Sequence, residues 1–153
     1  MKSTVLKYGF RGLIIGILIF GLHLFLLNSF DYGTNEILGH ISIVISLSVI
    51  YFGLKHYRDQ VNNGKLSLGV AIIIGVLISM LVGIGIGIVD FMYTKFINPE
   101  FFDDYAQMLR DQGREEEIME MSSGIMAAFM WVIVTVYGVI VSLVSGLILQ
   151  RKN

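Results

Sequence analysis

The chain has 153 residues, enough for a single domain, and carries a net charge of −1 with no cysteine. Hydrophobic residues make up 55% of it and charged residues 15%, which excludes a soluble globular domain, because one small core cannot bury that much apolar surface. The lack of cysteine excludes disulfides, thiolate metal sites and cysteine nucleophiles, and the near-zero net charge gives no sign of a nucleic-acid partner.

Four apolar stretches are long enough to cross a bilayer as helices, since a hydrocarbon core about 30 Å thick needs roughly 20 apolar residues. They cover residues 12–30, 37–54, 66–93 and 125–150. The second is short and includes His40, whereas the third is long enough to tilt or to extend past the lipid. The first lacks the alternating pattern of membrane-barrel strands. The sequence therefore predicts one all-α domain over residues 1–153, an integral membrane four-helix bundle with an amphipathic helical segment between spans three and four.

Lys and Arg gather before the first span, between the second and third spans, and after the fourth. These residues are Lys2, Lys7, Arg11, Lys55, Arg58, Lys65, Arg151 and Lys152, against the single acid Asp59. Acids outnumber bases in the loop between the first two spans and in residues 94–124. Because basic residues next to membrane spans stay in the cytoplasm, both termini are predicted to be cytoplasmic and residues 94–124 to lie on the outer side.

Residues 94–124 are the only sizeable stretch predicted outside the lipid. Asn98 and Pro99 indicate a helix start, Gly113 indicates its end, and a second short helix is predicted over residues 114–121. The apolar side chains of the first helix form a candidate docking surface for a partner: Phe101, Phe102, Tyr105, Met108 and Leu109. The alternative is a helical hairpin whose apolar face packs on the bundle or lies in the membrane interface.

Four ionisable side chains fall in the outer half of the predicted spans or at their border: His23, Glu36, His40 and Asp90, with Asp31 at the same level. Ionisable groups inside a span are costly, which makes these residues a candidate proton or metal site. The alternative is hydrogen bonding between helices, with Asp90 and Glu36 reaching water. No pair has the short spacing of metal-binding histidines, so no metal or cofactor is predicted.

Small residues recur four positions apart in three of the predicted spans. Such spacing lets two helix backbones approach closely in lipid. The glycines in these patterns are Gly12 and Gly16, Gly83 and Gly87, and Gly138 and Gly146. We predict that they pack within one bundle, and the alternative is a seam between copies of the chain through the first or third span.

Seven short segments are spread along the chain: 4–9 TVLKYG, 36–39 EILG, 51–55 YFGLK, 57–59 YRD, 63–71 NGKLSLGVA, 96–101 FINPEF and 143–152 LVSGLILQRK. In this order they resemble a bacterial membrane family catalogued as domain of unknown function 4199. The resemblance implies a four-span protein of the inner membrane of Gram-negative bacteria, with residues 94–124 in the periplasm. It implies no activity, because the family has no established one.

The predicted function is a non-enzymatic accessory or structural subunit that packs with itself or with a membrane-protein partner in the bilayer. The glycine patterns and the lack of a catalytic motif favour it. One alternative is a small transporter or ion-conducting oligomer with a polar site near the outer face, although a single copy offers no obvious pore. Another is an intramembrane enzyme that acts on lipid through His23 or Asp90, for which we find no nucleophile–base pair.

Overall fold

A computed structural model of the chain describes residues 1–26 and 32–150. Within these residues the chain is helical and contains no strand. Four helices of the described part are long and apolar enough to cross a membrane: Lys2–Phe25, Gly33–Val61, Leu68–Ile97 and Ser123–Leu149. The predicted all-α class with four spans is therefore confirmed.

Each span is built from one or more helical elements. The first is α1 (Lys2–Phe25), and the second joins α2 (Tyr32–Leu47), α3 (Val49–His56) and a π-helical turn (Tyr57–Val61). The third joins α4 (Leu68–Met92) and a second π-helical turn (Tyr93–Ile97). Next come α5 (Phe101–Asp111), a 3-10 turn (Glu115–Glu117) and α6 (Ser123–Leu149), which is the fourth span.

The first two spans are longer than hydropathy predicted. The first helix begins at Lys2, well before Gly12, because backbone hydrogen bonding continues through the basic residues at its start. The predicted end of this span, at Phe30, lies outside the described residues. The second span covers Gly33–Val61 rather than 37–54. Ser42 and Ser46 stay inside this helix because their hydroxyls donate to the carbonyls of Leu38 and Ser42, at 2.7 and 2.8 Å.

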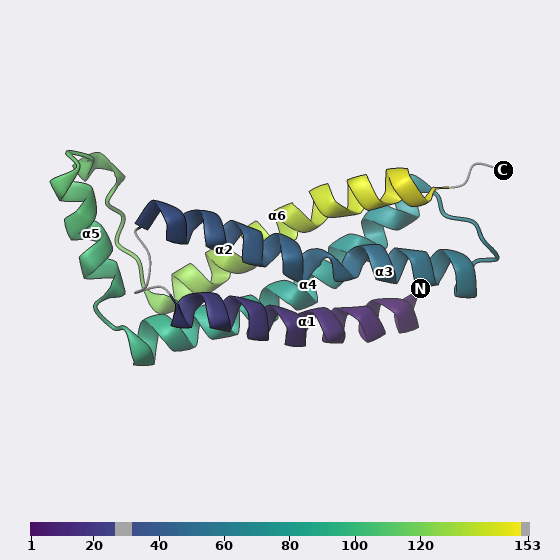
Figure 1. Cartoon of the computed structure of the whole chain (residues 1–153), viewed down its shortest axis with the longest axis horizontal. Helices are drawn as coiled ribbons and strands as arrows, with labels where there is room; N and C mark the ends of the chain where they lie inside the picture. Colours follow the sequence, from purple (N-terminus) through teal and green to yellow (C-terminus); the bar gives the residue numbers. More distant parts are fainter. Residues whose placement is uncertain (27–31, 151–153) are drawn as a thin grey trace.

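Helix α4 is the centre of the bundle. It packs against α1 on one side and α6 on the other (Figure 1). Its inward residues Ile74, Ile78, Val82 and Ile86 are fully buried among the other helices. Many large apolar side chains of α1 and α6 face outward instead, where lipid tails can solvate them.

Close contacts between helices explain where the small residues lie. Each of the six glycines predicted to pack sits against another helix of the same chain. The contacts are Gly12 with Val82, Gly16 with Ile86, Gly83 with Trp131, Gly87 with Ala127, Gly138 with Ser79, and Gly146 with Ala71. The single tryptophan, Trp131, also donates its indole N–H to the carbonyl of Met80 at 3.0 Å, which adds a polar bond between α6 and α4.

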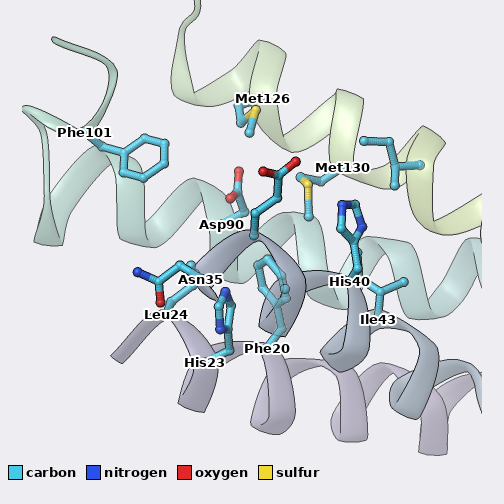
Figure 2. Close-up of a pocket in the computed structure, with 13 residues that line it drawn as sticks. Phe20, His23, Leu24, Asn35, His40, Ile43, Asp90, Phe101, Met126 and Met130 are labelled. Atoms are coloured by element: carbon cyan, nitrogen blue, oxygen red, sulfur yellow. The ribbon is translucent and has the colours of Figure 1, made fainter. Parts of the chain in front are cut away.

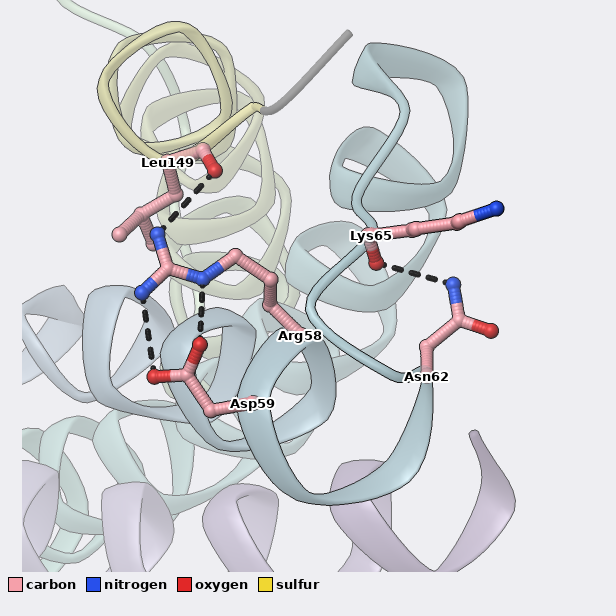
Figure 3. Close-up of polar contacts among 5 residues, drawn as sticks. All are labelled: Arg58, Asp59, Asn62, Lys65 and Leu149. Carbon is pink, nitrogen blue, oxygen red and sulfur yellow. Dashed lines mark hydrogen bonds and ion pairs between the residues drawn. The ribbon is translucent and has the colours of Figure 1, made fainter. Parts of the chain in front are cut away.

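The two ends of the bundle differ. Helix α5 crosses one end, whereas the N-terminus, the turn between the second and third spans, and the last turn of α6 lie at the other (Figure 1). At that second end, Arg58 binds Asp59 with Nε 2.6 Å from Oδ1 and donates from Nη1 to the carbonyl of Leu149 at 3.3 Å (Figure 3). Asn62 donates from Nδ2 to the carbonyl of Lys65 at 2.9 Å. These bonds shape the turn and tie the second span to the end of the fourth.

The outer segment departs from the prediction at both of its helices. Asn98 is not the N-cap of α5, because that helix starts later and its N-cap is Glu100; the N–H of Asn98 instead bonds to the carbonyl of Tyr93 at 2.8 Å and closes the π-helical turn that extends α4. Helix α5 begins at Phe101 and ends before Gly113, which has the left-handed φ of 70° that a helix stop requires. The second helix predicted over 114–121 is only the 3-10 turn Glu115–Glu117, since its adjacent carboxylates have no basic residue one turn later to support a helix.

Candidate functional site

A cavity of about 220 Å³ lies at the end of the bundle nearest α5 (Figure 2). Helices α1, α2, α4 and α6 and the first residue of α5 all contribute to its wall. Its apolar lining includes Phe20, Leu24, Ile43, Phe101, Met126 and Met130. The cavity therefore sits among all four spans and beneath the outer segment.

The four ionisable residues singled out in the sequence all line this cavity. His23 comes from α1, Glu36 and His40 from α2, and Asp90 from α4. The sequence predicts these residues at one depth, and the folded bundle adds that all four line the same cavity. Asp31, which borders the same level, lies outside the described residues.

Asp90 is the most buried of the four, with 5% of its surface exposed. Its Oδ2 has no hydrogen-bond partner among the described residues. The nearby hydroxyl of Thr94 donates to the backbone carbonyl of Asp90 at 2.9 Å, and so does not satisfy that oxygen. A buried carboxyl oxygen without a donor is costly, which makes Asp90 the strongest functional candidate on the wall.

The two histidines are held by contacts between helices. The Nδ1 atom of His40 lies 3.1 Å from the hydroxyl of Tyr137, and their rings stack at 5.8 Å, which joins α2 to α6. The His23 ring lies 5.7 Å from that of Phe20. It can approach α2 because Gly39 has no side chain, and a Cβ atom there would stand 3.3 Å from His23 Nε2.

The described residues around the cavity do not form a metal-binding site. Within residues 1–26 and 32–150, no group of three or more His, Asp or Glu side chains is placed to hold a metal ion. The four ionisable residues therefore share a wall without forming a ligand sphere.

Arg114 brings a positive charge to the outer segment close to the cavity. It pairs with Glu117 at 2.6 Å, and this hydrogen bond raises the pKa of Arg114, to which the charge of Glu36 adds a smaller effect. The same bond lowers the pKa of Glu117. The Arg114–Glu117 pair is therefore the main electrostatic contact of the segment after α5.

The residues of the candidate docking surface on α5 differ in how accessible they are in the folded chain. A groove of about 230 Å³ between α5 and the segment leading to α6 is lined by Phe101, Phe102 and Tyr105. Leu109 is fully buried and cannot contact a partner, and Met108 is half-buried. Phe101 also lines the cavity and meets the Tyr93 ring edge-on at 6.3 Å.

Several lining residues could not be found from the sequence. Met126 and Met130 belong to the apolar run of the fourth span and carry no local signal that sets them apart from lipid-facing residues. Tyr137 is likewise ordinary in sequence, and only the packing of α6 against α2 brings it to His40.

Comparison with known proteins gives one positive result. The family described as "Protein of unknown function (DUF4199)" matches residues 7–151. No curated protein and no solved structure matches the chain. Since the match extends over all four spans, the cavity and the outer segment, the chain belongs to the DUF4199 family.

Proposed function

We propose that this chain is a non-enzymatic accessory protein of the membrane that works by binding at its outer end. The observation that carries the proposal is the outer cavity, which His23, Glu36, His40 and Asp90 line. An ionisable side chain as buried as Asp90 in an apolar bundle is costly unless it serves a ligand or a partner.

The interior beyond the cavity supports binding rather than passage. Toward the opposite end of the bundle, Leu47, Ile50, Ile78 and Val82 are all fully buried. Among the described residues this packing is mostly apolar, and the fully buried Ser46, Ser79 and Ser142 are small and lie beside it. A small transporter or ion-conducting oligomer is the second candidate, favoured by the same shared wall of ionisable groups.

The cavity wall also favours a non-enzymatic role. Its described lining contains no Ser, Thr, Tyr or Lys side chain that could act as a nucleophile. The two carboxyls and two imidazoles could move protons, and the Tyr137 hydroxyl, 3.1 Å from His40 Nδ1, joins α6 to α2 outside the described lining.

The proposed setting is the bacterial inner membrane, with both termini in the cytoplasm and residues 94–124 in the periplasm. The distribution of Lys and Arg supports this orientation, and both described ends lie at the same end of the bundle (Figure 1). A membrane-protein partner or a second copy would then meet the protein at α5, where Phe102 and Tyr105 line the groove.

Transport and binding can be separated with purified protein in liposomes. We expect no proton or cation flux through the wild-type chain, His23→Ala or Asp90→Asn, because the core beyond the cavity is closed. Flux through the wild-type chain that disappears in Asp90→Asn would establish transport and overturn the accessory role.

Binding at the outer end can be tested in native membranes with a photo-crosslinking amino acid. Placed at Tyr105 it should give one dominant adduct, either with another protein or with a second copy. Placed at Ile140, an exposed position on α6 far from the groove, it should react with lipid. No protein adduct at Tyr105, or equal protein adducts at both positions, would contradict the proposal.

A further inference from the structure

We propose that the outer cavity binds a small organic amine, whose ammonium group pairs with Asp90 and whose apolar body rests on the aromatic and methionine side chains. This inference rests on the proposed function in one respect, since it assigns a ligand class to the same outer end. Asp90 carries it, because the residue is 5% exposed and lines the cavity, and its buried Oδ2 has no donor among the described residues.

The charges on the wall select a cation. Two carboxyl side chains, Asp90 and Glu36, line the cavity, and no Lys or Arg is among its described lining residues. Arg114, on the segment after α5, is not a lining residue and is paired with Glu117 at 2.6 Å. An ammonium group can supply the donors that Asp90 lacks, whereas an anion would meet two like charges.

The rest of the wall suits an apolar body next to that ammonium. Phe20 and Phe101 offer aromatic faces, which attract cations as well as apolar groups. Met126 and Met130 offer flexible, polarisable side chains that adapt to a ring. Figure 2 shows Phe101, Met126 and Met130 around the labelled Asp90.

The volume limits the ligand to a small one. About 220 Å³ is below the roughly 300–1,000 Å³ of pockets that hold drug-sized molecules. A single ring with a short amine arm is the size class that this space admits. Glu36 and His40 line the cavity and are exposed, so they lie at its opening.

An ammonium could also come from a lipid headgroup such as phosphatidylethanolamine. In that lipid a phosphate lies close to the ammonium and would need a cation of its own. The described lining has no Lys or Arg to supply one. The wall therefore favours an amine without a phosphate.

The test is calorimetric titration of the full-length chain in mild detergent with 2-phenylethylamine, with neutral 2-phenylethanol as the matched probe. We expect the amine to bind at least about tenfold more tightly than the alcohol, since a charged hydrogen bond is lost with the alcohol. Asp90→Asn should weaken amine binding by about tenfold or more, and Glu36→Gln by less. Asp103→Asn removes an exposed acid of α5 outside the cavity and should leave binding unchanged.

Equal binding of amine and alcohol to the wild-type chain would overturn the inference, and this comparison needs no variant to fold. Unchanged amine affinity in a folded Asp90→Asn variant would overturn it as well. So would displacement of the amine by phosphatidylethanolamine but not by phosphatidylglycerol in nanodiscs, because the lipid would then be the occupant. In each case a protein adduct at Tyr105 would still stand, so the two proposals can fail separately.

Discussion

Gly85 is the glycine of α4 whose Cβ position lies closest to the backbone of another helix. A Cβ atom there would lie 2.7 Å from the carbonyl oxygen of Leu13 on α1. A carbonyl oxygen in a helix cannot swing aside as the end of a side chain can. Any larger residue at this position must push α1 and α4 apart.

Replacement of Gly85 by alanine should therefore destabilise the bundle by about 1–3 kcal/mol, the range for overpacking a filled interior. Gly69 is the matched control in the same helix, because a Cβ atom there meets nothing within 4 Å. Gly69→Ala should be neutral or stabilising by up to about 1 kcal/mol, since alanine is the better helix former. Unfolding in mild detergent measures both, and equal effects would contradict the packing described.

Sequence patterns identify some packing glycines and miss others for a clear reason. Gly83 and Gly87 could be predicted because they lie four residues apart on one face of α4. Gly85 lies on another face, and its partner is a backbone atom of α1 that no pattern reveals. Gly75 faces Ser142, which only the crossing of α4 and α6 brings close.

The end of α6 depends on an element from another span. The last carbonyls of a helix have no partner inside it, and Arg58 of the second span donates to one of them, that of Leu149. Its guanidinium can bind Asp59 and Leu149 at once because its donors are arranged as a planar fork.

Loss of this contact should loosen the last turn of α6. In Arg58→Ala we expect hydrogen exchange over residues 146–150 to speed up by roughly threefold to tenfold, the effect of one hydrogen bond worth about 1 kcal/mol. Lys55→Ala removes the same charge from an exposed position nearby and should leave this exchange unchanged. If hydrogen exchange sped up to a similar extent in both variants, the lost positive charge alone would be the cause.

Helix ends were harder to predict than helices. The four spans follow from composition because lipid is the only solvent for such long apolar runs. Asn98 matches the pattern of a helix cap, yet its N–H completes the π-helical turn after α4, so the residue belongs to the end of the preceding helix. The run Glu115–Glu117 lies in the stretch predicted to be helical, but it forms a single 3-10 turn held by Arg114.

For the whole molecule, the two ends of the bundle should lie on opposite sides of the bilayer. The chain has no cysteine, so a single introduced cysteine gives an unambiguous label. We expect Glu116→Cys to react with a membrane-impermeant maleimide added to the outer side of the intact membrane. Gln60→Cys should react only after the membrane is opened, because basic residues near this turn, such as Arg58, favour its placement in the cytoplasm.

Both positions are exposed, so a difference between them reports sidedness rather than burial. Labelling of both from the same side would refute the four-span topology. Labelling of Gln60→Cys alone would mean that the orientation is inverted.

The depth of the candidate site in the membrane could be predicted from the sequence, but the lateral arrangement of its residues could not. The positions of His23, His40 and Asp90 along their spans fix their distance from the membrane surface. Their meeting around one cavity depends on how the helices are rotated and ordered, which hydropathy does not encode. The apolar half of the wall, with Met126 and Met130, could not be distinguished from lipid-facing surface in the sequence.

The bond between Trp131 and Met80 gives the molecule its own spectroscopic reporter. Since the chain has one tryptophan, its tryptophan emission comes from a single place, the contact between α6 and α4. Met130, the neighbour of that tryptophan, lines the cavity. Emission from unlabelled protein therefore reads out the separation of these two helices directly, whether heat, detergent or an occupant of the cavity drives them apart.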